Sequence, residues 1–416
     1  MENEPKYKKN VKLFPIYKMF SWDLLFYYAI SFLFYTQVKG FSASIVLLAD
    51  GFYPLFKLLF QIPCVSFVDS YGKRKAIILG NIFVTAGILT VLLCNSVPLL
   101  ILANLFFAIG YNFKGLCESS VLYDSLEGVE KRRDIFSKLD GKGSSFYYYL
   151  DAISAASTGF LFIINGYLPL IICFIFCCIS IFISFNFYET DSKINIKAKR
   201  KISEFKRFLK DFRYIQRNIF KSNRLKCLLL FSGLFHSLLS VLVTLRSSML
   251  TDLHVPEEYF GIVAAVLGLI SGIASKKQNW FHKKYKNKVL TYFSLPLSMF
   301  LIVLGLLMIA KLNYYITFAF IALYFTLFAL IKGPYYTLIK RYLNSFTTPD
   351  VNTKVYSANT VVESIFKTLT CFFCSYLLSI TTTSYALIIL GCVFTIVFII
   401  LLDYMRLRVR IKTRRI

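Results

Sequence analysis

The chain alternates between apolar runs of about 20 residues and short polar connectors, and a helix of about 20 residues crosses the ~30 Å hydrocarbon core of a bilayer. Of the 416 residues, 57% are hydrophobic and 17% are charged, which is too apolar for a soluble domain. The sequence therefore predicts an all-α integral membrane protein. The apolar runs predict twelve transmembrane helices, at approximately 14–36, 41–68, 76–95, 98–123, 138–164, 167–187, 226–250, 257–275, 289–310, 313–339, 355–380 and 383–404.

The connectors differ sharply in charge from one side of the predicted membrane to the other. One set carries most of the 48 Lys and Arg, and the other set contains only Lys39 and Lys311. Basic loops remain in the cytoplasm, so this asymmetry predicts a multi-pass protein of the cell (plasma) membrane with both termini cytoplasmic. The net charge of +26 thus reflects topology in a lipid bilayer, and we expect no nucleic-acid partner.

The longest polar stretch divides the predicted spans into two six-helix halves. The N-terminal bundle covers 1–188, a basic cytoplasmic linker covers 189–226, and the C-terminal bundle with its basic tail covers 227–416. A short internal repeat supports the two halves, because 67–75 and 281–289 share a Phe, a Tyr four residues later and basic residues after it. The linker is compatible with a solvated chain or with an amphipathic helix on the inner leaflet, which would bury Ile202, Phe205, Leu209, Phe212 and Ile215.

The connector between the second and third spans has the composition of a tight cytoplasmic turn. Asp69 ends an apolar run, Gly72 permits a positive φ, and the following residues, Lys73 and Arg74, are basic. Together with the twelve spans in two halves, this hinge resembles the major facilitator superfamily of secondary transporters. The segment VLYDSL, with Asp124, also looks like bacterial members of that superfamily.

The family signature in this loop runs Gly, three residues, Asp, Arg, any residue, Gly and two basic residues. The matching positions here are Asp69, Gly72, Lys73 and Arg74. Val65 and Ser70 stand where the family has its first Gly and its Arg. The resemblance implies alternating access of two six-helix halves, and it implies that Asp69 helps to lock the outward-facing state.

Ionisable residues inside the predicted spans cost at least ~2.5 kcal/mol each at mid-bilayer, so each needs a partner, a wet cavity or a function. Lys114 and Glu118 stand four residues apart on one helix face, which predicts a mutual ion pair, and the same spacing recurs at Glu363 and Lys367. The charges left without a local partner are acidic in the first half and basic in the second. They are Asp23, Asp151, Arg246 and Lys332.

A buried carboxyl group is protonated more readily than an exposed one, as a proton carrier requires. The proton-coupling candidates are Asp23, Glu118 and Asp151. In the family, helices 1, 4, 7 and 10 line the central cavity, so the resemblance places Asp23, Glu118, Arg246 and Lys332 there. The substrate-cavity candidates are Lys114, Arg246, Lys332 and His236. Snorkelling to the interface would equally explain Arg246, and hydrogen-bonded packing would explain His236.

These features favour a proton-coupled secondary transporter of a small-molecule substrate, working as a monomer by alternating access. Acids in the first half without partners favour efflux of an amphipathic compound by proton antiport. The alternatives are proton-coupled uptake of an anionic or peptide-like solute, favoured by the basic residues, and a lipid scramblase or receptor that no longer transports, suggested by Val65 and Ser70. The sequence contains no nucleotide-binding motif, metal-ligand spacing or catalytic set, so we expect neither a cofactor nor an enzyme.

Overall fold

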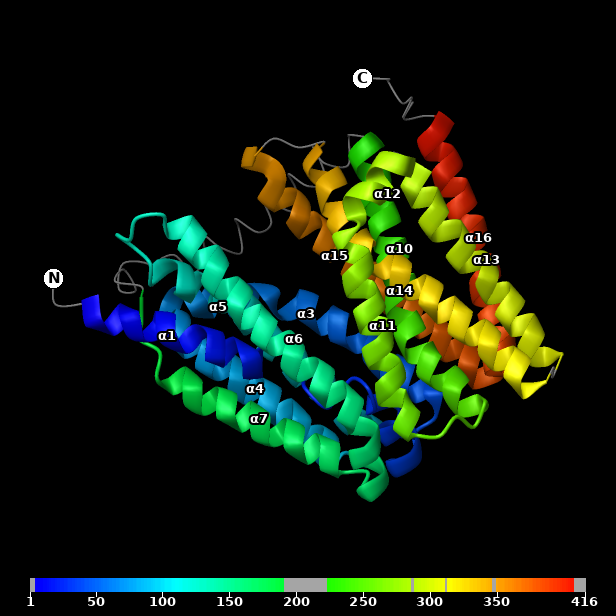
Figure 1. The fold of residues 1–416 in the computed structure, drawn as a ribbon, viewed down its shortest axis with the longest axis horizontal. Coiled ribbons are helices and arrows are strands. Elements are labelled where there is room, and N and C mark those ends of the chain that lie inside the picture. Colours follow the sequence, from blue (N-terminus) through cyan, green and yellow to red (C-terminus); the bar gives the residue numbers. More distant parts are fainter. Residues whose placement is uncertain (1–3, 191–222, 286–287, 311–312, 346–348, 408–416) are drawn as a thin grey trace. The chain divides into compact units, whose positions relative to one another are not determined.

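The computed structural model describes residues 4–190, 223–285, 288–310, 313–345 and 349–407 (Figure 1). The described residues form helices joined by short turns. The possible amphipathic helix of the linker, with Ile202 to Ile215, lies outside the described residues. The helices are α1 (Glu4–Ser21), α2 (Ser31–Leu33), the π-helix η1 (Phe34–Val38), α3 (Ala43–Tyr71), α4 (Lys73–Leu93), α5 (Val97–Asp124), α6 (Arg132–Ile164), α7 (Leu168–Phe185), α10 (Asn223–Asp252), α11 (Glu258–Lys276), α12 (Gln278–Tyr285), α13 (Val289–Ile309), α14 (Tyr314–Ser345), α15 (Pro349–Ile380) and α16 (Thr383–Leu407).

Eleven of the described helices are long and apolar enough to cross a membrane, and each corresponds to one of the predicted spans from the second to the twelfth. The first predicted span, 14–36, differs from the expectation of one continuous helix. Helix α1 ends at Ser21, and an irregular segment follows until α2 begins at Ser31. Phe26 within this segment has a φ of 62°, a backbone conformation that no α-helix contains. The first membrane segment is therefore a broken helix.

Two compact units divide the chain. The first comprises 1–41, 52–208 and 257–262, and the second comprises 42–51, 209–256 and 263–416. Helix α3 thus contributes its first residues to the second unit and the remainder to the first.

In the first unit, α4 packs against α5 and α7, and α1 packs against α6 and α7. The close contact of α4 with α5 requires glycine, because a Cβ added at Gly110 would lie 2.6 Å from Cγ2 of Val84. At one end of these helices, Phe14 and Tyr17 of α1 are buried in a cluster with Phe113 of α5. This packing holds the end of α1, and with it the helix break, against α5.

The core of the second unit is built around α10, which packs against α14, α15 and α16. Helices α13 and α16 form a second close pair, and a Cβ at Gly391 would lie 2.7 Å from Cγ1 of Ile302. Most of α10 is buried, including Arg246 and several serines, whereas Arg224, Lys226 and Asp252 near its ends are exposed. A polar group on α10 must therefore find its partner inside the unit.

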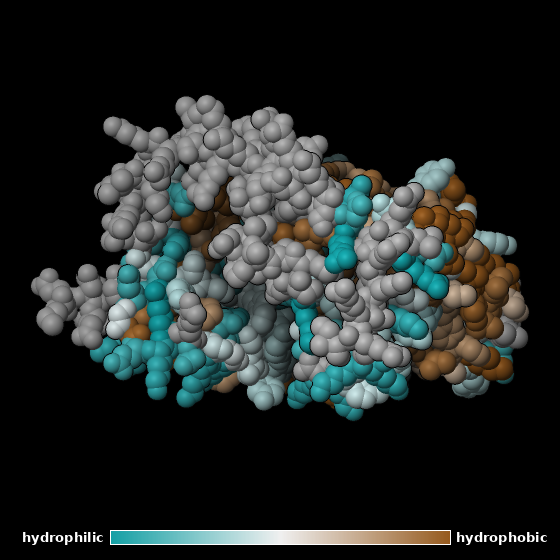
Figure 2. Space-filling model, turned by 90° about the horizontal axis from the view of Figure 1, so that it is seen from above, coloured by the Kyte–Doolittle hydropathy of each residue, from teal (hydrophilic) through white to brown (hydrophobic). Residues whose placement is uncertain are grey.

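Large apolar side chains also lie exposed on the outside of the helices. Figure 2 shows brown, apolar side chains gathered over the part of the second unit that Figure 1 labels α13 and α16. Leu306 of α13 and Ile400 of α16 are 54% and 64% exposed. Such a surface suits contact with lipid and is rare on soluble proteins.

Candidate substrate and coupling sites

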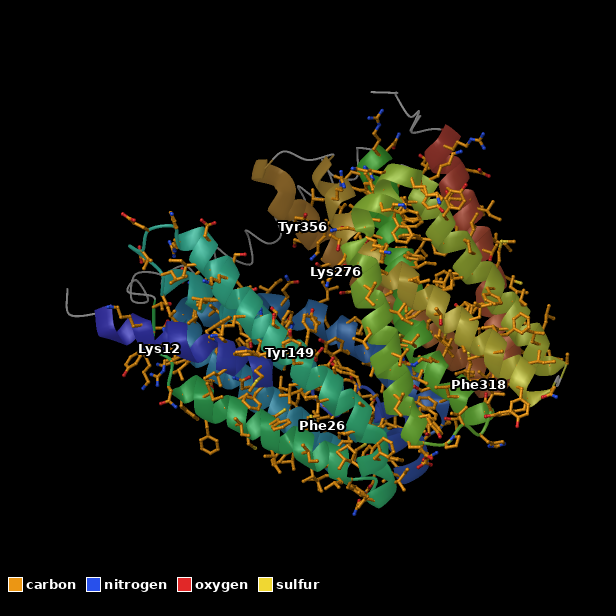
Figure 3. All side chains as sticks on the ribbon, in the orientation of Figure 1. Lys12, Phe26, Tyr149, Lys276, Phe318 and Tyr356 are labelled. Atoms are coloured by element: carbon orange, nitrogen blue, oxygen red, sulfur yellow. The ribbon has the colours of Figure 1, made fainter. Side chains whose placement is uncertain are left out.

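Asp23 lies at the break in the first membrane segment, two residues after α1 ends. Its Oδ1 accepts hydrogen bonds from the hydroxyls of Tyr28 at 2.8 Å and Tyr111 at 2.7 Å, and from the backbone N–H of Leu24 at 2.9 Å. Asp23 forms no ion pair with any residue that the structure describes. Neutral donors thus hold the Asp23 carboxyl group. Asp23 itself lies on the irregular segment after α1, in which Figure 3 labels Phe26.

Glu118 lies in a second polar cluster, which includes side chains from the last turn of α1. Its Oε1 accepts hydrogen bonds from the hydroxyls of Tyr17 at 2.8 Å and Ser21 at 3.3 Å, and Nζ of Lys114 lies 3.8 Å away. The predicted pair of Lys114 and Glu118 is therefore present. Lys114 also donates to the backbone carbonyl of Ser21, the last residue of α1. A buried ammonium group thus caps the C-terminus of the broken helix, where the helix dipole is negative.

Asp151 lies on α6, half-buried, and its carboxyl group interacts with the hydroxyl of Tyr147 and with the negative charge of Asp23. The structure therefore brings two of the three proton-coupling candidates into one electrostatic neighbourhood. Glu118, the third candidate, differs from these two in having a cationic partner, Lys114.

The hinge between α3 and α4 forms the tight turn that the sequence predicts, with Gly72 at a φ of 89°. Lys73 forms an ion pair with Asp124 at the end of α5, and Arg74 donates to the carbonyl of Phe185 at 2.8 Å. The carboxylate of Glu189 accepts hydrogen bonds from the backbone N–H groups of Lys73 and Arg74, at 3.2 Å and 3.0 Å, and so caps α4.

Asp69 is half-buried two residues before the end of α3, and the departing residue Ser70 donates to the carbonyl of Ser66 at 2.8 Å. The ion pair and the cap of the hinge thus come from Asp124 and Glu189, residues distant in sequence from the signature itself.

Arg246 of α10 and Lys332 of α14 lie in the second unit. Arg246 is 8% exposed, and Lys332 is half-buried with its Nζ 5.6 Å from the ring centre of Phe328. Neither forms an ion pair with the described residues. The positive charges of Arg246 and Lys367 both act on Lys332, so the three cations occupy one electrostatic neighbourhood.

The carboxyl groups of the second unit have other partners. Asp50 accepts a hydrogen bond from the hydroxyl of Thr244 at 3.1 Å and is influenced by the charge of Lys367. Glu363 accepts hydrogen bonds from Ser232 and Asn359, each at 2.8 Å.

His236, on α10, contacts the hydroxyl of Tyr336 through Nδ1 at 3.4 Å. This contact fits the hydrogen-bonded packing role that the sequence also allowed.

Tyrosine hydroxyls that were not predicted from the sequence supply several of the hydrogen bonds in these sites. Tyr17, Tyr28 and Tyr111 all donate to membrane carboxylates. The local signal was weak, because 28 tyrosines are spread through the chain and most resemble packing or interface residues. Only the fold shows which of them reach a carboxyl group.

The helix arrangement, the broken first span and the charged clusters within the spans define a multi-pass integral membrane protein of the secondary transporter class. A family model described as "Major Facilitator Superfamily" matches residues 18–366. The chain belongs to this superfamily, whose members move small-molecule substrates across membranes and are not enzymes. A comparison with curated protein sequences finds no significant match.

Several solved structures share this fold. The nucleoside transporter NupG matches with a TM-score of 0.69 and 12% identity, covering 97% of this chain and 100% of that one. A POT family transporter in complex with 5-aminolevulinic acid matches with a TM-score of 0.65 and 13% identity, covering 97% of this chain and 95% of that one. A D-xylose-proton symporter matches at 0.63 and 12%, covering 96% of each chain. Identities this low show a common fold, and the prediction of a superfamily fold is confirmed.

Proposed function

We propose that this protein is a proton-coupled transporter that takes up a small solute carrying an anionic group. The observation that supports this most is the pair of cations in the second unit, Arg246 and Lys332, which form no ion pair with the described residues. A cation at the centre of a membrane helix costs ~2.5–3.5 kcal/mol even on the lenient insertion scale. A carboxylate or phosphate group on the solute would offset that cost each time it binds.

Efflux of an amphipathic compound by proton antiport, which the sequence favours, has less support in the geometry. That preference rested on acids of the first half having no partners. Glu118 has a cationic partner in Lys114, with Nζ and Oε1 3.8 Å apart. Asp23 and Asp151 also form no ion pair with the described residues, but hydroxyl groups of the first unit contact both carboxyl groups. The cations Arg246 and Lys332 therefore carry the preference for an anionic solute.

Asp23 is the proposed carrier of the coupling proton. Its partners are two tyrosine hydroxyls and a backbone N–H, all of them neutral, and it forms no ion pair with the described residues. Glu118 differs from Asp23 in having a cationic partner, Lys114. Asp151, which interacts with Asp23 and Tyr147, is the proposed second acceptor.

Membrane potential favours symport for such a solute. An anion that enters a cell against an inside-negative potential must overcome ~2.3 kcal/mol per charge per 100 mV. A proton that moves with the anion cancels this cost. Transporters of the same fold have been captured with 5-aminolevulinic acid and with sulfate, both of which carry anionic groups.

The proposed topology follows the charge distribution. We propose a monomer in the cell membrane with both termini cytoplasmic, in which the bundles 1–188 and 227–416 move relative to each other in alternating access. The conformational hinge consists of Asp69, Gly72, Lys73 and Arg74. Two other candidates stabilise the bundles, Lys114 through its pair with Glu118 and His236 through its contact with Tyr336.

The test is proton movement in inside-out vesicles that contain the full chain and a trapped pH-sensitive dye. The probes are glucose 6-phosphate, alanyl-alanine, succinate, uridine and tetraphenylphosphonium. We expect proton movement with at least one probe that carries an anionic group, loss of that movement in Lys332→Gln, and solute exchange without proton movement in Asp23→Asn. Proton movement with tetraphenylphosphonium alone would overturn the proposal in favour of efflux. Lipid flip without any solute response would overturn it in favour of a scramblase.

A further inference from the structure

Helix α12 (Gln278–Tyr285) connects two membrane-crossing helices and belongs to neither. Helix α11 ends at Lys276 and α13 begins at Val289, so α12 lies where two adjacent spans reach the membrane surface. Figure 1 shows it at the ends of these helices. Within the second unit α12 packs against α13 and α14.

One side of α12 is fixed to the unit by aromatic and polar contacts. The ring of Phe281 lies 5.7 Å from that of Phe293 on α13, in an edge-to-face arrangement. Nδ1 of His282 lies 3.1 Å from the hydroxyl of Tyr342 on α14. These contacts determine which side chains of α12 point away from the protein.

The opposite side carries exposed lysines around an exposed tryptophan. Trp280 is 49% exposed, and Nζ of Lys284 lies 4.7 Å from its ring centre. The other exposed side chains are those of Lys276, Lys277 and Lys283. Figure 3 labels Lys276 at the start of this surface. The segment from Lys276 to Lys288 contains no Asp or Glu, so nothing within it neutralises these charges.

We propose that this surface, defined as Lys276, Lys277, Trp280, Lys283 and Lys284, binds the headgroups of anionic phospholipids. Lysine ammonium groups contact the lipid phosphates, and the indole of Trp280 lies at the boundary between headgroups and acyl chains. Tryptophan is enriched at this depth, and clustered lysines next to a membrane span attract anionic lipid. This inference does not depend on the proposed function.

A free anion in water would explain the lysines but not the indole. A half-exposed Trp beside two membrane spans has apolar surface to bury, and acyl chains provide that contact. The basic side of the chain is also the side that the sequence assigns to the cytoplasm, whose leaflet carries anionic lipid. These two points favour phospholipid over soluble phosphate.

Trp280 provides a direct probe, because the chain has only two tryptophans. In the Trp22→Phe variant, Trp280 is the sole indole. The full-length variant is reconstituted into phosphatidylcholine vesicles that contain an equal fraction of brominated phosphatidylglycerol or brominated phosphatidylcholine. We expect the brominated anionic lipid to quench Trp280 about two-fold more strongly than the neutral lipid.

Charge substitutions in the same background separate local binding from general attraction. Lys283→Gln combined with Lys284→Gln should remove most of the preference, whereas Lys142→Gln, an exposed lysine of the first unit, should leave it intact. Unquenched Trp280 emission confirms that each variant retains the fold around α12.

Equal quenching by the two brominated lipids would overturn the proposal. Loss of the preference when inorganic phosphate is added at constant ionic strength would also overturn it, because the surface would then be a site for free phosphate.

Discussion

The two units of this transporter treat their buried charges differently. In the first unit, Lys114 and Glu118 form an ion pair, and Lys18 pairs with Asp140 at 2.6 Å. In the second unit, Arg246 and Lys332 form no ion pair with the described residues, even though Arg246 is buried, with only 8% of its surface exposed.

This difference separates two uses of a charge in a membrane protein. A paired charge with hydrogen bonds is a structural element, because its desolvation is offset within the fold. A cation without a counter-ion retains that cost until a ligand supplies the opposite charge. We therefore assign structure to the paired cluster of the first unit and solute recognition to the cations of the second.

Breaking the pair in the first unit should produce the largest effect. Lys114→Met leaves the Glu118 carboxylate without its cation and removes the cap on Ser21, so the free energy of unfolding should fall by about 3 kcal/mol. Thermal unfolding in detergent measures this effect.

The double variant Lys114→Met with Glu118→Gln should recover part of that loss, because no unpaired charge remains. Full stability in the single variant would show that the pair is not structural.

Removing a cation from the second unit should affect transport more than stability. Lys332→Gln should lower kcat/KM for an anionic solute about 30-fold or more, equivalent to ~2 kcal/mol, because a buried charge-assisted contact is lost. Proton-driven uptake in vesicles measures it. Lys332→Arg keeps the charge and should retain more activity than Gln. Equal activity of Gln and Arg variants would contradict an electrostatic role.

A smaller effect is expected at the proton carrier. Tyr111→Phe removes one of three hydrogen bonds to Asp23, each of which is worth about 1 kcal/mol. Loss of one donor leaves the proposed proton carrier less firmly positioned, so the rate of proton-coupled uptake in vesicles should fall about five-fold. Tyr149→Phe on α6, at an exposed tyrosine, serves as the control. An uptake rate equal to that of the wild type would contradict the role of Asp23 as proton carrier.

The hinge pair should contribute less than the pair of Lys114 and Glu118, because both of its side chains are more exposed. Lys73→Gln should destabilise the protein by ~0.5–1 kcal/mol. The loss should shrink at high salt, since exposed pairs are screened. A loss that is independent of salt would indicate that Asp124 is more deeply buried than its 28% side-chain exposure shows.

A pH effect of limited size is expected at His282, outside the membrane spans. Burial, followed by the nearby charge of Arg341, lowers the pKa of His282 from 6.5. The unfolded chain therefore binds a proton more readily than the fold, and stability should decrease as pH falls through 6.5. His282→Gln should flatten this part of the stability profile. An identical profile in the variant would assign the effect to another group.

The sequence predicted the spans well because a membrane imposes one hydropathy rule on the whole chain. It also predicted the pair of Lys114 and Glu118, because residues four apart share a helix face. The break after Ser21 left no such signal. The run from 14 to 36 is mostly apolar despite Lys18 and Asp23, and only the fold shows the positive φ of Phe26.

Hydrogen bonds between residues far apart in the chain could not be predicted from the sequence either. The cap that Glu189 places on α4 joins residues more than a hundred positions apart, and so does the hydrogen bond from Tyr17 to Glu118. The cations without partners were found as candidates because charge inside a span is rare. Only the structure shows that they form no ion pair with the residues that it describes.

The most direct test of the central claim is ligand-induced thermal stabilisation of the detergent-solubilised protein. Matched pairs of probes differ only in charge, such as succinate and succinamide, or glucose 6-phosphate and glucose. A ligand that binds the folded protein raises its melting temperature. We predict that at least one anion stabilises the wild type more than its neutral partner, and that Arg246→Gln and Lys332→Gln each abolish the difference. Equal stabilisation by both members of every pair, or an anion effect that survives both substitutions, would contradict the account.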